Sequence, residues 1–549
     1  MPVERDIGIL FAGLGHPDVV QERCLLSRVV RPNEASEYGR RHRFGEIRTV
    51  RDYQRNVPVV TYTDLEPRIA RVARGEPGVL TCEPVRRFFA TSGSTGAAKI
   101  VPVTSSLIAD KARAFGVYWG LLFRCHPGAG RGKVVGNFAD SSGGADTVPC
   151  GLPLTSEGAF WNAVSEATQT RGRSPVPRSV TQIADPDSRY YAVARILLEE
   201  DVSLLMALNP STLLVLFRKL NLFVEDLLRD VERGGLSRDV EVSAEVRRHV
   251  TGTYAGNPRR ARQLRALLRN IEPSLLAHEV WPSLELVVSW RSPMQQPYLR
   301  LLAPHLAPLP QRDYLLMASE GVIAIPTEDH ASGGVLATPF HFYEFIPEED
   351  SDSDTPRVRL AGELEVGRNY VVLLSTSAGL YRYHIGDVVR VRGMQEHTPV
   401  VEFLHRVGAT CSLTGEKLTE AQVVQAVSVV ARDHAVALEG FTLHPAPEGF
   451  PHYVLLLEPS ASPEPGRLVE LLRAFDRELA ASNVEYRAKR VSDRLGPPEL
   501  WVAATGTYER WRRRRVAAGA NDAQIKPTHL TRDTLFSAGL EIRERIPAP

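Results

Sequence analysis

The chain contains a loop of small and hydroxyl-bearing residues that can hold a phosphate group. In the segment FFATSGSTGAAKIVPVT, an apolar strand leads into this loop and a lysine follows it. The residues concerned are Thr91, Ser92, Gly93, Ser94, Thr95 and Lys99. Glycines let the backbone approach a phosphate, the N–H and hydroxyl groups donate hydrogen bonds, and the lysine supplies a positive charge. The pattern differs from a GxxxxGK[ST] P-loop because no hydroxyl follows the lysine, and a flexible surface loop is the alternative interpretation.

A carboxylate lies in the segment LYRYHIGDVVRV, where alternating apolar residues flank Gly386 and Asp387. We expect a tight turn at Gly386. A carboxylate held beside such a turn can accept two hydrogen bonds from a ribose diol, as an acidic residue does in dinucleotide sites. An ordinary hairpin turn is the alternative.

A second carboxylate lies in YLLMASEGVIAIP, where Ser319, Glu320 and Gly321 interrupt two apolar runs. A single carboxylate in this position suits Mg²⁺ that is held jointly with triphosphate oxygens, since magnesium sites often use one or two carboxylates. The alternative is a polar turn between two strands without a ligand.

The elements that must position these residues indicate an α/β fold, because helical segments and short apolar strands alternate along most of the chain. We expect buried strands at 202–208 and 283–290. Asn209 should cap a helix that has Pro210 at its first position and runs to Gly234. After Arg406 the pattern changes to a strand, YVLLLEP, between two helical segments. We therefore predict a large N-terminal domain over 1–406 and a small, mobile α/β lid over 407–549.

Composition excludes several classes of protein. The 549 residues are 43% hydrophobic, which is enough for large cores, and 66 basic against 65 acidic side chains give a net charge of +1. This balance argues against a nucleic-acid binder. No run reaches the length of about 20 apolar residues that a membrane helix needs. The five cysteines lack paired or metal-like spacing. We expect a soluble cytoplasmic protein with reduced thiols, without nucleic-acid or membrane partners.

The three motifs, taken together and in this order, resemble the adenylate-forming superfamily. Within it, the chain is similar to the acyl acid–amino acid amido synthetases, the auxin- and jasmonate-conjugating family and its bacterial relatives. The matching pieces include RNVPVVTYTDLEPRIARVARGEP, WPSLELVVSW, HFYEFIPEE, GLYRYHIGDVVRV, TGEKLTE and NVEYRAKR. They span about residues 45 to 530, so the resemblance covers nearly the whole chain.

The resemblance implies a role for each site residue. Thr91 to Thr95 and Lys99 would bind the phosphates, Ser319 the nucleotide, Glu320 the metal and Asp387 the ribose. Phe340 and Tyr343 would form an adenine wall, with apolar core packing as the alternative. Arg406 would precede the hinge. Lys417 would reach the phosphates from the lid, unless it is a solvated lysine at a helix start. Lys526 would meet the reacting carboxylate and phosphate when the lid closes.

The chain departs from the family pattern at three places. The loop reads SGST where plant members usually have SGTS. Thr528 and His529 stand where the family often places an arginine, which weakens the alignment around Lys526. Gly408 stands where many adenylate-forming enzymes carry a hinge aspartate, and glycine permits the backbone rotation of a hinge.

The resemblance implies an enzyme that uses ATP and Mg²⁺ to convert a carboxylic acid into an acyl-adenylate, with release of pyrophosphate. The acyl group would then pass to the amine of an amino acid or a similar acceptor, forming an amide. Two alternatives stay open: an acyl- or aryl-CoA ligase with the same first half-reaction, and a nucleotide-binding regulator without turnover.

Overall fold

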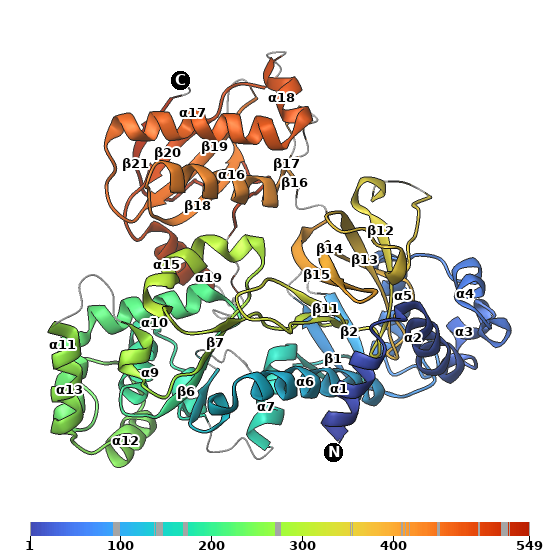
Figure 1. The fold of residues 1–549 in the computed structure, drawn as a ribbon, viewed down its shortest axis with the longest axis horizontal. Coiled ribbons are helices and arrows are strands. Elements are labelled where there is room, and N and C mark those ends of the chain that lie inside the picture. Colours follow the sequence, from blue (N-terminus) through green and yellow to red (C-terminus); the bar gives the residue numbers. More distant parts are fainter. Residues whose placement is uncertain are drawn as a thin grey trace.

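The structure is a computed structural model of the 549-residue chain. It describes residues 2–91, 99–136, 138, 146–167, 174–269, 276–351, 353, 355–407, 410–411, 413–414, 416, 418–446, 451–491, 495–517, 525 and 528–547. Helices and several sheets make up a mixed α/β protein, which confirms the predicted fold class (Figure 1).

The first part of the chain is helical and leads into a small sheet. Its helices are α1 (Pro2–Ala12), α2 (Pro17–Cys24), the π-helix η1 (Leu25–Val30), α3 (Glu37–Arg41), α4 (Val50–Asn56) and α5 (Tyr62–Ala73). The sheet has the order β2-β1-β5-β4, from Lys99–Thr104, Val85–Thr91, Pro153–Thr155 and Asp146–Thr147. The long helix α6 (Ser105–Cys125) follows β2, and α7 (Glu157–Ala167) follows β5.

A parallel sheet forms the centre of the second part. Its order is β3-β6-β7-β8, from Lys133–Val135, Val202–Met206, Leu286–Val288 and Gln311–Arg312. Strands β6 and β7 are buried, as their apolar sequences predict. The helices of this part are α8 (Arg178–Thr181), α9 (Pro186–Leu197), α10 (Pro210–Leu222), α11 (Val224–Arg233), α12 (Ala244–Thr253), α13 (Pro258–Arg269), α14 (Ala277–Val280) and α15 (Gln296–Leu306).

The single helix predicted from Pro210 to Gly234 is wrong, because the structure has two helices there. Asn209 caps α10, and its side chain accepts a hydrogen bond from the backbone N–H of Ser211. At Phe223 the backbone leaves the helical region, with φ −102° and ψ 15°, and α11 begins at the next residue. Apolar residues face the core on both sides of the break, so their spacing alone does not reveal it.

A seven-stranded antiparallel sheet forms the third part. Its order is β12-β13-β14-β15-β11-β10-β9, from Phe342–Pro347, Asn369–Ser375, Tyr383–Gln395, Thr398–Arg406, Gly334–Leu336, Gly321–Ile325 and Leu316–Ala318. The Tyr343 hydroxyl donates to the carbonyl oxygen of Val322, so β12 lies against β10 although the two strands are not neighbours in the sheet. The sheet therefore folds back upon itself and brings its distant strands together.

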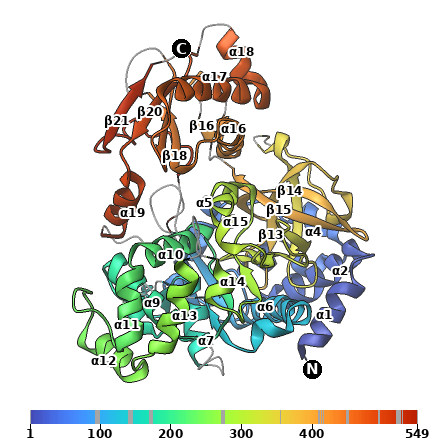
Figure 2. The same cartoon turned by 60° about the vertical axis from the view of Figure 1, so that its left-hand side comes forward.

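The C-terminal part is a separate α/β layer above the rest of the molecule (Figures 1 and 2). Its main sheet has the order β18-β19-β20-β21, from Leu438–Pro445, Tyr453–Pro459, Glu499–Ala503 and Ile542–Ile546. A small sheet pairs β16 (Thr410–Cys411) with β17 (Leu418–Thr419). The helices are α16 (Glu420–Asp433), α17 (Pro465–Ser482), α18 (Val484–Val491) and α19 (Thr507–Ala517). The helix–strand–helix pattern of α16, β19 and α17 matches the sequence prediction.

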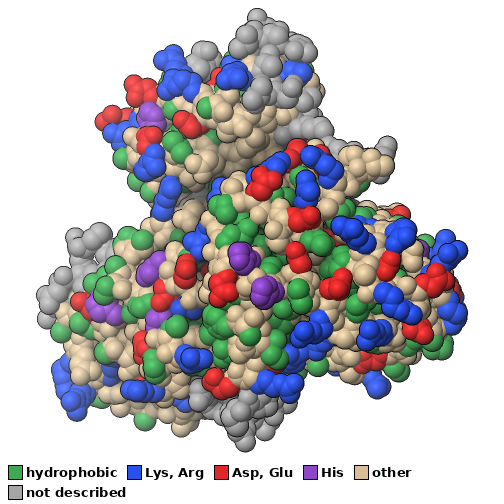
Figure 3. Space-filling view, turned by 45° about the vertical axis from the view of Figure 1, so that its right-hand side comes forward, with side chains coloured by type: hydrophobic (Ala, Val, Ile, Leu, Met, Phe, Trp, Pro, Cys, Tyr) green, Lys and Arg blue, Asp and Glu red, His purple; other side chains and the backbone are tan. Residues whose placement is uncertain are grey.

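Among the described residues, the hydrophobic clusters of the C-terminal layer draw their buried members from Cys411 onward, and the larger clusters draw theirs from before Arg406. The domain boundary at Arg406 stays a prediction. In the described part of the chain, no helix combines the length and apolar character that crossing a membrane requires. On the face in Figure 3, basic and acidic side chains are interspersed without a continuous basic surface.

Candidate active site

Asp387 and Arg406 are paired across two neighbouring strands of the seven-stranded sheet. They are register partners in β14 and β15, and the Arg406 Nε donates to Asp387 Oδ1 at 2.8 Å. A second guanidinium nitrogen donates to the carbonyl oxygen of Ile385. Because the Asp387 carboxylate lies beside it, the pKa of Arg406 is raised. The aspartate is nearly buried, with 11% of its side chain exposed.

The predicted tight turn at Gly386 is wrong, because Gly386 lies inside strand β14. Leu373 of β13 pairs with His384 of β14, and Val371 pairs with Val388. Two positions on β13 therefore face four on β14, so the extra residues of β14 form a bulge. Gly386 has φ +85°, a backbone conformation that residues other than glycine rarely adopt. The bulge, rather than a hairpin turn, places Asp387 opposite Arg406.

Glu320 lies in the turn between β9 and β10, as the polar break in the sequence predicts. Ala318 and Gly321 pair across this hairpin, so Ser319 and Glu320 are its two loop residues. A Cβ atom on Gly321 would lie 2.9 Å from both the His341 ring and Leu374 Cδ2. Glycine therefore permits the turn to approach β13, whose neighbour in the sheet is β14, the strand that carries Asp387.

The charges of Asp387 and Arg406 act on Glu320, so the two carboxylate segments lie close together. Burial raises the pKa of Glu320 and the Asp387 carboxylate raises it further, whereas Arg406 and Lys111 lower it. Burial and the Glu320 carboxylate likewise raise the pKa of Tyr383, three positions before Gly386 on β14. Glu320, Asp387 and Arg406, predicted from separate segments, thus share one partly buried site.

Lys99 and Thr91 are paired at the end of the β1–β2 hairpin that adjoins residues 92–98. The Lys99 Nζ lies 5.3 Å from the centroid of the Tyr62 ring, and the Tyr62 hydroxyl accepts the backbone N–H of Ile100. Val60, two residues before Tyr62, forms an isolated β-bridge with Tyr383 of β14. This chain of contacts links the base of the predicted phosphate loop to the strand of Asp387.

Phe340 and Tyr343, the predicted adenine wall, lie in the hydrophobic core. Phe340 is 1% exposed and Tyr343 is fully buried. The Tyr343 hydroxyl donates to the carbonyl oxygens of Val322 and Ala337. The packing interpretation accounts for both positions, and a contact with adenine stays a prediction.

Several predicted residues fall outside the described part of the chain. They are Ser92, Gly93, Ser94, Thr95, Gly408, Lys417 and Lys526. For Thr91 the structure describes the backbone, which ends β1, and not the side chain. The phosphate, hinge and lid roles of these residues therefore stay predictions.

Sequence reasoning missed Lys111, which lies on helix α6. Its side chain is 1% exposed, and its Nζ donates to the carbonyl oxygen of Ala318, at the base of the Ser319–Glu320 turn, at 2.8 Å. A signal was present in the sequence, because Leu107, Lys111, Ala114 and Tyr118 follow one another at helical spacing on the apolar stripe of α6. A lysine on such a stripe must find partners in the interior.

Sequence reasoning also left Arg382 and Glu344 without a role. These two residues belong to the matching segments GLYRYHIGDVVRV and HFYEFIPEE, and they form a buried ion pair at 2.8 Å. The Arg382 guanidinium also donates to the carbonyl oxygens of Gln54 and Val57. The pair thus joins β12, the residue directly before β14 and the end of α4.

A metal ion at this site would depend on Glu320. Among the described residues, no group of three or more His, Cys, Asp or Glu side chains is arranged to hold a metal ion by itself. A buried carboxylate beside a second carboxylate fits Mg²⁺, which binds oxygen ligands and is usually shared with substrate phosphates.

The profiles of one family match most of the chain. The GH3 family N-terminal domain matches residues 14–310, the central domain residues 334–406 and the C-terminal domain residues 421–534. Similar curated proteins include one named indole-3-acetic acid-amido synthetase GH3.8, from Oryza sativa subsp. indica. It is 28% identical over 537 residues, which cover 93% of this chain and 87% of the relative.

A second relative, from Nicotiana attenuata, is named jasmonoyl–L-amino acid synthetase JAR6. It is 25% identical over 531 residues, or 92% of this chain and 90% of the relative. Among solved structures, the GH3.15 acyl acid amido synthetase in complex with 2,4-DB has the same fold, with a TM-score of 0.85 at 22% identity. That match covers 100% of this chain and 99% of the other. The resemblance inferred from the motifs is confirmed: the chain belongs to the GH3 family, and it carries the N-terminal, central and C-terminal domains of that family in order.

Proposed function

We propose that this chain is an ATP-dependent ligase that activates a carboxylic acid as an acyl-adenylate and transfers the acyl group to the amine of an amino acid or a similar acceptor. The observation that carries the proposal is the meeting of Glu320, Asp387 and Arg406 in one partly buried site. Relatives that align over more than nine-tenths of the chain are named an indole-3-acetic acid-amido synthetase and a jasmonoyl–L-amino acid synthetase, which supports the same reaction class.

In the first half-reaction, a carboxylate oxygen of the acid attacks the α-phosphorus of ATP. A bond forms between that oxygen and phosphorus, the bond to the β-phosphate bridging oxygen breaks, and pyrophosphate leaves. Catalysis of such a step is mainly positioning and charge stabilisation. Asp387 would hold the ribose, with its carboxylate oriented by Arg406, and Lys99 would lie at the phosphate side. Magnesium bound at Glu320 would screen the repulsion between the two anions.

In the second half-reaction, the amine nitrogen attacks the carbonyl carbon of the mixed anhydride. The nitrogen loses a proton, the carbon–oxygen bond to AMP breaks, and an amide results. Residues 407–549 would form a lid that pivots near Gly408. Its closure would exclude water that could hydrolyse the anhydride. Lys417 and Lys526 would enter the site from this lid.

We place the reaction in the cytoplasm. The structure describes all five cysteines and none of them forms a disulfide bond, which supports a reducing compartment.

The test is a screen for acid-dependent pyrophosphate release across aromatic, indolic and aliphatic acids, each repeated with every amino acid and with CoA. We expect pyrophosphate release with at least one acid and an amide product identified by its mass. A thioester formed only with CoA would identify an acyl-CoA ligase instead. ATP binding without pyrophosphate release for any acid would indicate a regulator without turnover.

A further inference from the structure

The ammonium group of Lys111 is buried between the base of the Ser319–Glu320 turn and strand β1. Its Nζ lies 2.5 Å from Glu157 Oε1 and 2.8 Å from the carbonyl oxygen of Ala318. It also lies 5.8 Å from the centroid of Phe89, on the strand that leads into the predicted phosphate loop. The three donors of the ammonium group thus face a carboxylate, a carbonyl and an aromatic ring, the last within cation–π range.

The turn that Lys111 contacts lacks the usual features of a stable two-residue hairpin. Such loops normally place glycine or asparagine at positive φ, because that geometry matches the twist of the strands. Here the loop residues are Ser319 and Glu320, and neither has positive φ. The pairing of the two strands is also irregular between Val322 and Ala324. The turn therefore depends on contacts from outside the hairpin, and Lys111 supplies one at its base.

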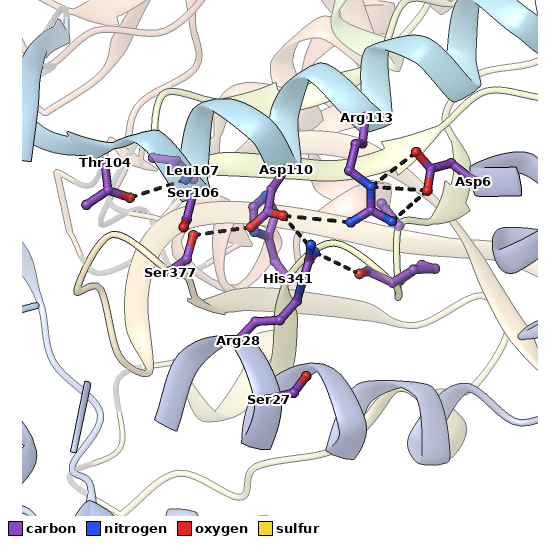
Figure 4. Close-up of polar contacts among 12 residues, drawn as sticks. Asp6, Ser27, Arg28, Thr104, Ser106, Leu107, Asp110, Arg113, His341 and Ser377 are labelled. Atoms are coloured by element: carbon purple, nitrogen blue, oxygen red, sulfur yellow. Dashed lines mark hydrogen bonds and ion pairs between the residues drawn. The ribbon is translucent and has the colours of Figure 1, made fainter. Parts of the chain in front are cut away.

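Helix α6 is itself fixed in place by a network of charged side chains, so Lys111 has a stable base (Figure 4). The Thr104 hydroxyl caps the helix by accepting the Leu107 N–H. Asp110, the residue before Lys111, is paired with Arg28 of η1 at 2.6 Å and accepts the Ser377 hydroxyl. Arg113 is paired with Asp6 of α1 at 2.7 Å. These contacts tie α6 to three other segments.

Glu157 is the partner that keeps the lysine in place. Its carboxylate accepts from both Lys111 Nζ and the indole Nε1 of Trp161, one turn further along α7. Its side chain is 12% exposed, so the pair has little contact with solvent. A buried lysine with a fixed carboxylate partner keeps one position, and the carbonyl of Ala318 is held with it.

We propose that Lys111, held by Glu157, is a positioning residue that fixes the Ser319–Glu320 turn relative to strand β1 for nucleotide binding. This inference rests on the proposed function, since it assigns ATP to that site. Loss of the lysine would let the turn move, and Glu320 would lose its place beside Asp387. The effect should appear in nucleotide affinity more than in the rate of the chemical step.

The test measures binding of ATP with Mg²⁺, without the acid substrate, by calorimetry well below the melting temperature of each variant. We expect Lys111→Met to weaken ATP binding by about tenfold, the effect of one lost charged hydrogen bond. Lys111→Arg should recover part of the affinity, because it keeps the charge and the donors. In turnover, KM for ATP should rise more than kcat falls.

Arg312→Met is the matched control. Arg312 is also a buried cation, with 2% of its side chain exposed, and it pairs with the partly exposed Asp329 at 2.6 Å. This control should lose stability and keep the ATP affinity of the wild type. Equal affinities for Lys111→Met and the wild type would overturn the proposal, as would an equal loss in both variants.

A second variant covers the case in which Lys111→Met does not fold. Glu157→Gln retains an acceptor oxygen and removes the charge that holds the lysine, so it should weaken ATP binding severalfold. Wild-type affinity in this variant would then overturn the inference. If the wild-type chain itself does not bind ATP, the proposed function fails; if it binds ATP and the variants bind it equally well, only the role of Lys111 fails.

Discussion

Arg406 holds Asp387 from the last position of strand β15, directly before the chain leaves the seven-stranded sheet. The 2.8 Å contact between Arg406 Nε and Asp387 Oδ1 fixes the orientation of the carboxylate. The residue expected to bind ribose is therefore joined to the residue expected to precede the hinge. A change at either residue should affect the nucleotide site.

We predict that Asp387→Ala weakens ATP binding while the fold stays intact. Hydrogen bonds to a charged acceptor contribute about 1.5–3 kcal/mol, so the affinity should fall by at least about tenfold. Calorimetric titration with ATP checks the affinity, and thermal unfolding checks the fold. Glu402→Ala is the control, because it breaks the Arg390–Glu402 pair between the same two strands. Unchanged affinity in a folded Asp387→Ala variant would rule out the ribose role.

We predict that Lys526→Ala separates the two half-reactions. A lysine that offsets the charge shared by the carboxylate and the α-phosphate acts mainly in the transition state of adenylation, so kcat should fall more than KM rises. Acid-dependent ATP–pyrophosphate exchange should therefore drop sharply. Amide formation from a preformed acyl-adenylate should drop much less, because no second anion has to approach.

The outcome also tests the alignment of the C-terminal segment. If Lys526→Ala exchanges pyrophosphate at the normal rate, Lys417 becomes the better candidate. If both half-reactions fall equally, Lys526 supports docking of the lid rather than chemistry.

We predict a pH-dependent contribution of Asp110 to stability. Burial raises the pKa of Asp110 to about 6, against the attraction of Arg28. The charged and titratable groups around it are Arg28 of η1, Arg113 of α6, Glu83, Cys24 of α2 and Tyr343 of β12. An unfolded aspartate has a pKa of about 3.9.

Between these two pKa values, the native state binds more protons at Asp110 than the unfolded state does. The free energy of unfolding should therefore fall as the pH rises from about 4 to about 6, by on the order of 3 kcal/mol at about 1.36 kcal/mol per pKa unit. Asp110→Asn should remove this part of the slope, which urea unfolding at pH 4 and pH 7 measures. Parallel pH profiles for both proteins would contradict the prediction.

We predict that Asp187 holds the C-terminal layer against α10. The Arg513 Nη2 of α19 lies 2.9 Å from both Asp187 oxygens, and the Lys219 Nζ of α10 lies 2.7 Å from one of them. Figure 2 shows α19 between the C-terminal sheet and α10. Asp187→Ala should release this contact, and limited proteolysis near Arg406 and Gly408 should then become faster in the absence of ligand.

An adenylate analogue should slow this cleavage in the wild type, because the lid then closes over the nucleotide. Asp226→Ala is the control, since it breaks an exposed ion pair with Arg229 within α11. Identical digestion of the wild type and Asp187→Ala would show that the contact does not restrain the lid.

The sequence by itself determined the elements and the types of side chain at the site. The strand Tyr453–Pro459 and the cap at Asn209 follow from local apolar runs and capping preferences. The polar break at Ser319 and Glu320 likewise predicted the turn that the structure has. These features depend on residues close together in the chain, where backbone geometry and side-chain type are directly coupled.

Only the tertiary structure decided which residues meet. The bulge at Gly386 arises from pairing between β13 and β14, and a local reading of Gly-Asp gives a turn instead. The break at Phe223 separates α10 and α11, and buried apolar residues recur at helical spacing in both helices. Lys111 and Ala318 are 207 positions apart in the chain. Such contacts depend on which strands pair and on which partners the buried charges have. The local spacing of apolar residues does not determine either of these.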